Sequence, residues 1–599
     1  MRPSWLSTIF TILLVLVFGL VSYQGYAQRL PREETLYVAI SKPGMGLGPS
    51  NFNIYTPGFD RSRTGLHQFV WEYLYYMNLE SGEYIPFLAE SQPQYSADFR
   101  SITVKLRDGI KWNDGMPFTA DDVVFTYNML LQNAPKLTWS SEVAKWMASV
   151  RKIDDLTVRF VLKSPNSRLH TNREAFPAVA IWGGITIMPK HIWEHVDPVT
   201  YNNSPVVGTG PYNLISTSET QFVLERRDDW WATDVFGVVP APRFVVYRYF
   251  GPETSTAIAL ANNDVDSPAI GILSLDTYLQ VKRRNPYVTA WHERAPFAWL
   301  DPCPRAFMVQ NAREPFNRRE VRWGLSYLID RDAIADLAYQ GTTTASPHVY
   351  PLYAGLQPFF DAIQDVLEKY PTTEYNPAKA EEMFRAAGFR KGADGGWITD
   401  TGQRFTLNFL VASGNSEDMA VTAIVADQLR AGGVDVTVNP MSGPPQADTR
   451  LRGDWDLAYQ PFCPGFIFDN LELFHSKFKV PLGDPAPWYE RNSFRYGNPE
   501  FDTIVDEMAA TPPTDVDKMT RLFHDAIEIL HHDLPVIMGM QAPALVPFST
   551  AYWTGWPTAA NPWNMPVNWW ATFNTVVVGY PDPATGEWVG GIRPSRPGG

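Results

Sequence analysis

The five residues from His191 to His195 read His-Ile-Trp-Glu-His and could bind a zinc ion. In the H-x-x-E-H pattern of inverted zinc peptidases, two imidazoles one helical turn apart hold the metal and the glutamate acts as general base. The pattern is short, and Pro189 just before it indicates a helix that is only beginning. A secreted zinc peptidase using His191, Glu194 and His195 is therefore an alternative but not the preferred interpretation.

Other arrangements of reactive residues carry less information. His531, His532 and Asp533 are neighbours, and neighbouring side chains on a helix diverge by about 100° and rarely share one ion. The sequence has no Gly-x-Ser-x-Gly motif of a serine hydrolase. Cys303 and Cys463 are the only cysteines, so they could form one disulfide or stay apart, and they are too few for a four-thiolate zinc site. We expect neither an enzyme nor a bound cofactor or metal.

Composition and charge narrow the class of partner. A chain of 599 residues suggests about four structural units. Charged residues make up 19%, below the about 25% of a typical soluble domain, while aromatic residues reach 14%. The net charge of −14 is spread along the chain without a basic stripe, which argues against nucleic acid as a partner. The excess of aromatic rings serves large cores and could also supply stacking surfaces for a ligand.

The first residues indicate export. Arg2 precedes an apolar run over residues 9–21, and Gly25-Tyr26-Ala27 follows as a small-x-small pattern. The run is shorter than the ~20 residues that span a bilayer, so a cleaved signal peptide over residues 1–27 is favoured over a retained anchor. We expect cleavage after Ala27 and a periplasmic or extracellular protein at the cell envelope.

Short apolar runs alternate with capped helices, which predicts a mixed α/β fold. Helices should begin after Thr119, after Asn376 and near Asn317, because these residues can cap free backbone N–H groups. Asp330 should cap a further helix that stops at Gly341. The expected strands are Leu36 to Ile40, Ser101 to Leu106, Thr157 to Leu162, Phe222 to Glu225, Phe244 to Tyr249, Phe405 to Ala412 and Val434 to Val438.

Four segments together resemble the family 5 extracellular solute-binding proteins, which serve importers of oligopeptides, nickel complexes and some oligosaccharides. The longest reads LRDGIKWNDG and continues through PFTADDVVF over residues 106–125. The others are the stretch 188–231 with GTGPY and RRDDWW, the stretch 307–334 with PFN and IDRDAI, and the stretch 375–389. Their order and spacing cover most of the chain after the signal peptide.

The resemblance implies a type II periplasmic-binding-protein-like fold of the large class, with two α/β lobes and a subdomain inserted in the first. It also implies an exported substrate-binding protein of an ABC transporter, a monomer that closes its lobes on a ligand and delivers it unchanged to membrane permease subunits. The implied division is lobe I at 28–71, 187–295 and 544–599, the insertion at 72–186, and lobe II at 296–543.

The ligand class stays open between oligosaccharide and oligopeptide. Peptide binders of this family hold the ligand's amino end with an aspartate after a Trp-containing stretch. The corresponding stretch after residue 459 lacks Trp, and the sequence does not fix the register of Asp469. The tryptophans between residues 552 and 570 look like those of members that carry β-linked oligosaccharides, whose faces stack on flat rings. We favour an oligosaccharide. The candidate ligand-binding residues are Asn53, Trp182, Trp299, Gln460, Phe462 and Asp469, with core packing as the alternative role of the aromatic ones.

Overall fold

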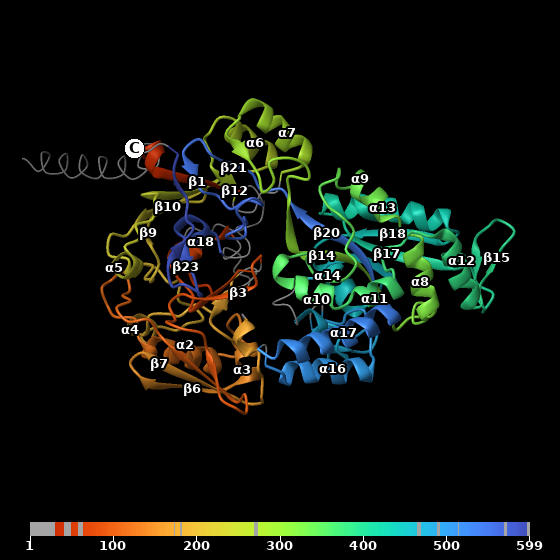
Figure 1. Cartoon of the computed structure of the whole chain (residues 1–599), viewed down its shortest axis with the longest axis horizontal. Coiled ribbons are helices and arrows are strands. Elements are labelled where there is room, and N and C mark those ends of the chain that lie inside the picture. Colours follow the sequence, from red (N-terminus) through yellow and green to blue (C-terminus); the bar gives the residue numbers. More distant parts are fainter. Residues whose placement is uncertain are drawn as a thin grey trace, which may run out of the picture.

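The structure is a computed structural model (Figure 1). It describes residues 30–40, 50–57, 64–78, 80–172, 174–179, 183–268, 273–463, 469–487, 491–512, 514–567 and 572–595. The predicted signal peptide at residues 1–27 lies outside these ranges. Within them, no helix combines the length and the apolar character needed to cross a membrane.

Lobe I is the part of the chain built on a five-stranded sheet with the order β12-β1-β11-β10-β9. Its strand β1 (Thr35–Ile40) is buried along its whole length and pairs in parallel with β11 and β12 on either side. Burial on both faces explains why this strand is apolar at nearly every position. The other strands are β9 (Tyr212–Thr217), β10 (Gln221–Arg226), β11 (Phe244–Tyr249) and β12 (Ser267–Pro268), with helices α6 (Glu253–Ala261) and α7 (Leu275–Arg284) following β11 and β12.

A four-stranded antiparallel sheet with the order β4-β5-β7-β6 lies below this sheet in Figure 1. Helix α2 (Ala120–Gln132) covers it and begins with a full capping box, in which Thr119 accepts from the backbone and Asp122 bonds back to Thr119 N–H. The predicted helix start at Thr119 is confirmed. The strands and second helix are β4 (Gln94–Tyr95), β5 (Ser101–Lys105), β6 (Met147–Asp154), β7 (Thr157–Leu162) and α3 (Ser140–Trp146).

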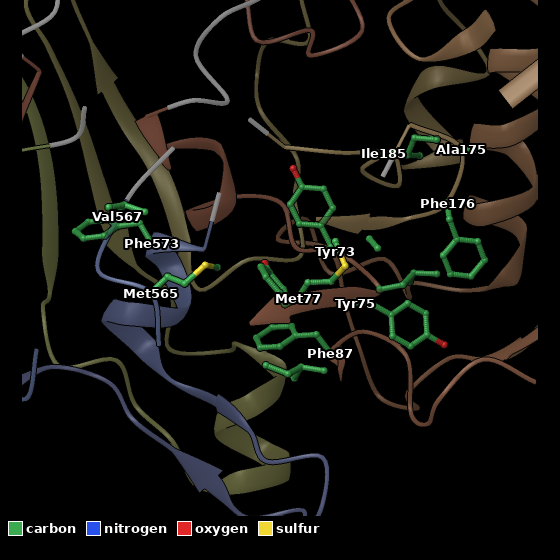
Figure 2. Close-up of a cluster of buried hydrophobic side chains, with 14 of the residues drawn as sticks. Tyr73, Tyr75, Met77, Phe87, Ala175, Phe176, Ile185, Met565, Val567 and Phe573 are labelled. Atoms are coloured by element: carbon green, nitrogen blue, oxygen red, sulfur yellow. The ribbon is translucent and has the colours of Figure 1, made fainter. Parts of the chain in front are cut away.

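The core of lobe I joins segments that are far apart in the sequence. Figure 2 shows Met77 and Phe87 of the β2–β3 region near Met565 and Phe573 from the C-terminal part. The elements here are β2 (Tyr75–Asn78), β3 (Glu83–Pro86), β8 (Ala178–Val179), α4 (Lys190–Trp193), α5 (Trp231–Phe236), β13 (Val288–Thr289), β21 (Phe548–Ser549), β22 (Trp553–Thr554), α18 (Phe573–Val578), β23 (Tyr580–Pro581), β24 (Trp588–Val589) and β25 (Arg593–Pro594).

A buried carboxylate ties two of the family-like motifs together in this lobe. Glu72 is 1% exposed and accepts hydrogen bonds from the indole N–H groups of Trp230 and Trp231, each at 2.9 Å. Gly208 of the GTGPY motif packs so closely on the 66–70 segment that an added Cβ would lie 2.0 Å from the carbonyl oxygen of Val70. These motif residues therefore pack together in the core of lobe I.

Lobe II is the part built on the second five-stranded sheet, with the order β18-β17-β19-β14-β20. Strand β17 (Thr406–Ala412), helix α13 (Ser416–Ala431) and strand β18 (Asp435–Met441) form a parallel crossover unit, and α14 (Gly443–Arg452) leads back to β19 (Leu457–Pro461). Around it lie α8 (Arg319–Tyr327), α9 (Arg331–Leu337), α10 (Gln357–Asp361), α11 (Gln364–Lys369), α12 (Pro377–Ala386), β15 (Arg390–Lys391), β16 (Trp397–Ile398), α15 (Asp469–Glu472), α16 (Pro499–Ala510) and α17 (Val516–Asp533).

Two long antiparallel strands connect the halves of the molecule. β14 (Trp299–Val309) enters lobe II and β20 (Val536–Ala544) leaves it, and Trp299 pairs with Ala544 where they begin and end. In Figure 1 they lie at the edge of lobe II that faces lobe I. The two-lobed α/β fold is thus as expected, while the residue boundaries set for the lobes and the insertion stay predictions.

The helix starts in lobe II agree with the sequence except for one. Asn376 caps α12 by accepting from the backbone of Lys379, and Asp330 caps α9 by accepting from Ala333. Asn317 was expected to open α8, but the N-cap is Arg318, which makes no side-chain cap, while the amide of Asn317 donates to Glu314. The chain turns at Asn317 and begins the helix only afterwards.

Candidate functional site

In lobe II, the chain reverses its direction across the sheet at the carboxyl ends of β17 and β19. These two strands are parallel neighbours, yet the chain leaves β17 through α13 toward β18, whereas β19 lies on the opposite side of β17. In open α/β sheets, ligands bind outside the carboxyl ends of strands at such a reversal. The same edge meets the first half of the connecting strand β14, because Arg305 pairs with Pro461 at the end of β19.

Polar side chains gather at this edge from four elements. Arg305 of β14 lies 3.4 Å from the carboxylate of Glu417 in the first turn of α13, and Tyr339 donates to the same carboxylate oxygen at 2.8 Å. The hydroxyl groups of Tyr339 and Tyr459 are 2.9 Å apart. Burial opposes the charge on Arg305, but Glu417 and the nearby acidic groups outweigh it, so the pKa of Arg305 is raised. This guanidinium is therefore fixed in its charged form.

Asp418, Arg450 and Gln460 lie beside these residues. We call the whole group the sheet-edge cluster, and it consists of Arg305, Tyr339, Glu417, Asp418, Arg450, Tyr459 and Gln460. Gln460 of β19 accepts from the guanidinium of Arg450 on α14 at 2.8 Å. Asp418 is 8% exposed, and its Oδ1 atom has no hydrogen-bond partner among the described residues. Burial raises the pKa of Asp418 to about 6, although the positive charges of Arg305 and Arg450 lower it. A buried carboxylate oxygen without a partner is costly, so a ligand N–H or O–H group that reaches it would be stabilised.

The groups of this cluster are suited to hydrogen bonding. Its two arginines face two carboxylates, with a neutral amide and two phenols beside them. Groups of this kind hold hydroxyl, amide or carboxylate groups of a ligand in fixed orientations. Asn415 caps α13 by accepting from the backbone N–H groups of Glu417 and Asp418. This cap fixes the position of the first helical turn, which carries both carboxylates. The chemistry available is therefore recognition through hydrogen bonds.

Of the six predicted site residues, Gln460 is the one placed in this cluster. Asn53 is fully buried and donates to the carbonyl oxygens of Pro198 and Tyr201, so its amide is used inside lobe I. Phe462 is also fully buried and stacks on Phe474 with ring centroids 5.6 Å apart. For Phe462 these contacts favour the alternative of core packing.

Trp299 lies at the start of β14, between the lobes. Its indole N–H donates to Glu80 of the β2–β3 turn at 2.9 Å, and its ring stacks on Tyr353 of lobe II. Trp182 lies outside the described residues, and Asp469 begins α15 with a side chain that is likewise outside them. Ligand contact by any of the six predicted residues stays a prediction.

The C-terminal tryptophans that the structure describes are used in packing. Trp553 is fully buried and reaches the carbonyl oxygen of Thr35, and Trp556 stacks on Phe548 with ring centroids 4.9 Å apart. The indole of Trp563 donates to Gly555. These rings offer no support for a stacking surface, and residues 568–571 lie outside the described ranges.

The zinc-like motif does not form a helix with two histidines on one face. Helix α4 covers only Lys190–Trp193, so Glu194 and His195 follow it. His191 points to Asp114, with 2.7 Å between Nε2 and Oδ2. No group of three or more potential metal ligands comes together anywhere in the described ranges. The geometry gives the zinc peptidase alternative no support.

Residues outside the predicted set supply most of the cluster. Arg305 lies on β14, Glu417 and Asp418 lie on α13, and Arg450 lies on α14, and no motif marks these residues in the sequence. The position of Asn415 after an expected strand could have indicated the cluster. A helix capped by Asn415 places the next acidic residues, Glu417 and Asp418, at the carboxyl edge of the sheet. Three of the six predicted residues were aromatic, and of these Phe462 packs in the core.

The two cysteines form a disulfide at the same edge. Cys303 in β14 and Cys463 just after β19 are bonded, with Cα atoms 4.2 Å apart. The backbone N–H of Phe462 also donates to the carbonyl oxygen of Pro304 at 2.8 Å. Of the two possibilities left open by the sequence, pairing is the one observed. It fixes the end of β19, and with it Gln460, to the connecting strand.

Comparison with known proteins identifies the family. A model of the bacterial extracellular solute-binding proteins, family 5, matches residues 83–476, which is more than half of the chain. The chain is similar to the glutathione-binding protein GsiB of Pectobacterium atrosepticum, with 26% identity over 76% of this chain and 79% of that protein. It is also similar to the oligopeptide-binding protein AppA of Bacillus subtilis, with 25% identity over 67% of this chain and 70% of that protein.

Solved structures agree on the fold. A periplasmic oligopeptide-binding protein from Thermotoga maritima superposes with a TM-score of 0.78 and 24% identity over 94% of this chain and 100% of that one. A second structure of that protein, bound to mannohexaose, has a TM-score of 0.71 and 24% identity over 94% of this chain and 99% of that one. By the family match and this shared two-lobed architecture, the chain belongs to the bacterial extracellular solute-binding proteins of family 5.

Proposed function

We propose that this protein is an exported substrate-binding protein that captures a neutral oligosaccharide between its lobes and delivers it unchanged to an ABC permease. The sheet-edge cluster of lobe II carries the proposal. It would form one wall of the ligand site, and closure would bring lobe I against the ligand's other side. We propose that the protein works as a monomer and without a cofactor.

The charge balance of the cluster supports a neutral ligand. Arg305 is paired with Glu417, and the charge of Asp418 is balanced by Arg305 and Arg450. The ammonium group of a free peptide needs an acidic partner that is not already compensated. Sugar hydroxyl groups both donate and accept, so they can use Asp418 Oδ1 and the arginines together. The mannohexaose held by the Thermotoga maritima protein of the same fold is consistent with this choice.

An oligopeptide is the second candidate. AppA of Bacillus subtilis and the Thermotoga maritima protein are both named for oligopeptides. In that case Arg305 and Arg450 would face the carboxylate end or acidic side chains of the peptide. The two candidates differ in the ligand and share the same wall of the cleft.

A ligand panel separates the candidates. The mature protein would be melted with cello-, xylo- and manno-oligosaccharides and with di- to pentapeptides, because a ligand bound only by the folded state raises Tm. We expect a Tm increase with an oligosaccharide of one linkage type and no increase with peptides. Tm increases with peptides alone would show that the ligand is a peptide and not an oligosaccharide.

A substitution in the cluster tests where the ligand binds. Arg450→Ala should raise the Kd of the active oligomer at least tenfold, since hydrogen bonds to a charged group are worth about 1.5–3 kcal/mol. Arg452→Ala on the same helix is the matched control, because Arg452 pairs with Asp448 and Gly483 at the surface. Equal affinity of the two variants for the oligomer would show that the cluster is not part of the ligand site.

A further inference from the structure

Apart from the connecting strands, the lobes meet at a hydrogen-bonded contact near the bottom of Figure 1, where α3 faces α16. Ser167, in the loop after β7, donates from its hydroxyl group toward the carbonyl oxygens of Ala509 and Thr511, at 2.7 and 2.8 Å. Its backbone N–H also reaches the Ala509 oxygen, at 3.4 Å. Ser167 is 1% exposed although it lies in a loop, because lobe II covers it.

The partners of Ser167 explain why this contact is favourable. Ala509 is in the last turn of α16, and Thr511 is the residue that caps this helix. The final carbonyl groups of a helix have no partner within the helix and need one from elsewhere. Ser167 supplies it from the opposite lobe. When the lobes separate, water has to replace both the donor and the acceptors, so the contact favours closure only by its modest net strength.

Opposite charges surround the same contact. Glu174 of lobe I and Arg491 of lobe II are 3.9 Å apart. Burial works to raise the pKa of Glu472 in lobe II, but Lys477 together with Lys145 and Arg168 of lobe I outweighs it, and the pKa is lowered. Opposite charges thus face each other across this contact, between Glu174 and Arg491 and around Glu472, so the electrostatic term also favours closure.

A second contact lies beside the connecting strands. Gly355 of lobe II packs on the β2–β3 turn of lobe I so closely that an added Cβ would be 2.9 Å from the carbonyl oxygen of Ser81. The Glu80 carboxylate accepts from Trp299 next to it. The described residues of the two lobes therefore touch at separated places, which also include a hydrogen bond from the Gln340 amide of lobe II to Asp276 of lobe I at 3.3 Å. Each of these contacts is made by side chains and backbone of the protein itself.

We infer that Ser167 and the end of α16 form a clasp that favours the closed conformation before any ligand is bound. A ligand then completes a closure that the chain already favours, and its escape requires the clasp to open. Because apparent affinity depends on the population of the competent state, the clasp tunes affinity from outside the ligand site. The inference depends on the two-lobed fold and not on the chemical class of the ligand.

Small-angle X-ray scattering of the ligand-free mature protein tests the clasp. The wild-type profile should fit a predominantly closed molecule. Ser167→Ala should raise the ratio of open to closed molecules about fivefold, the factor expected for one hydrogen bond of ordinary net strength. Ser164→Ala, at an exposed position of the same loop, is the matched control and should leave the profile unchanged. Circular dichroism melting verifies that each variant is folded.

A charge exchange gives an independent reading of the same contact. Glu174→Arg places two arginines together and should increase the radius of gyration of the ligand-free protein, and adding Arg491→Glu should restore the wild-type value. A wild-type protein that is already open, or a Ser167→Ala profile identical to that of Ser164→Ala, would overturn the clasp. These measurements use no ligand, so a wrong ligand class would leave them unaffected.

Discussion

Glu72 provides a quantitative test of how lobe I is held together. Its carboxylate is buried beneath Trp230 and Trp231, and burial raises its pKa from 4.5 to about 7 despite the two indole donors. The folded protein therefore binds a proton at Glu72 over a pH range in which the unfolded chain has released it. The stabilisation is complete below pH 4.5 and is lost as the pH rises through 7.

The size of this effect follows from the two pKa values. The difference between about 7 and 4.5 corresponds to about 3 kcal/mol of unfolding free energy. Glu72→Gln removes the titration. One indole then faces the amide N–H₂ group instead of an acceptor, which adds a cost that does not depend on pH. The difference in unfolding free energy between wild type and Glu72→Gln should thus change by about 3 kcal/mol between pH 4.5 and 8.

Urea unfolding of both proteins across this pH range measures the difference. Subtracting the unfolding free energy of one protein from that of the other at each pH isolates the contribution of Glu72, because Asp418 and the buried His348 and His531 titrate in both proteins. Asp98→Asn is the control. The Ser96 hydroxyl and a backbone N–H lower the pKa of this exposed carboxylate, so the contribution of Asp98 to the unfolding free energy is lost only as the pH falls toward its lowered pKa. A difference between wild type and Glu72→Gln that is flat from pH 4.5 to 8 would refute the reasoning.

Two further substitutions test the packing and the covalent link. Gly208→Ala should cost about 3 kcal/mol of unfolding free energy, because the new Cβ would lie 2.0 Å from the Val70 oxygen. Gly109→Ala is the control and should cost about 1 kcal/mol, because Gly109 has open space around it and a φ of +81°. Similar urea midpoints for the two variants would contradict the close approach at Gly208. Replacing Cys303 and Cys463 by alanine should cost about 4 kcal/mol, since the bond closes a loop with a sequence separation of 160, and a reducing agent should lower the Tm of the wild type but not of the double variant.

Local patterns in the sequence were enough to predict many elements of the fold. β7 and β11 have the bounds expected from their short apolar runs, and the Thr119 capping box forms because both of its partners lie within one turn. The start of α8 was wrong because Asn317 bonds to Glu314 in the preceding turn, a competing local interaction that a capping preference does not reveal.

The candidate site was less accessible because it depends on long-range pairing. Arg305 and Arg450 reach the same edge only after β14, β17 and β19 are aligned in one sheet, which sequence spacing does not specify. Large aromatic residues were ambiguous for another reason: Phe462 suits a ligand cleft and a core equally well, and here the core takes it. Gln460 was chosen from the segment after residue 459 that the family resemblance singles out, and the structure places it in β19 beside Arg450.

The order of the strands along the chain also bears on how the protein is made. The sheet of lobe II uses residues from Trp299 to Ala544 without interruption. In lobe I, by contrast, Thr35 of β1 accepts a hydrogen bond from Trp553 and Tyr76 accepts one from Asn574, so these contacts form only after the C-terminal residues are made. A chain growing from its N-terminus can thus complete lobe II while lobe I still exposes an unfinished core. Contacts of such wide sequence separation form slowly, so the newly made protein should depend on chaperones until its last residues arrive.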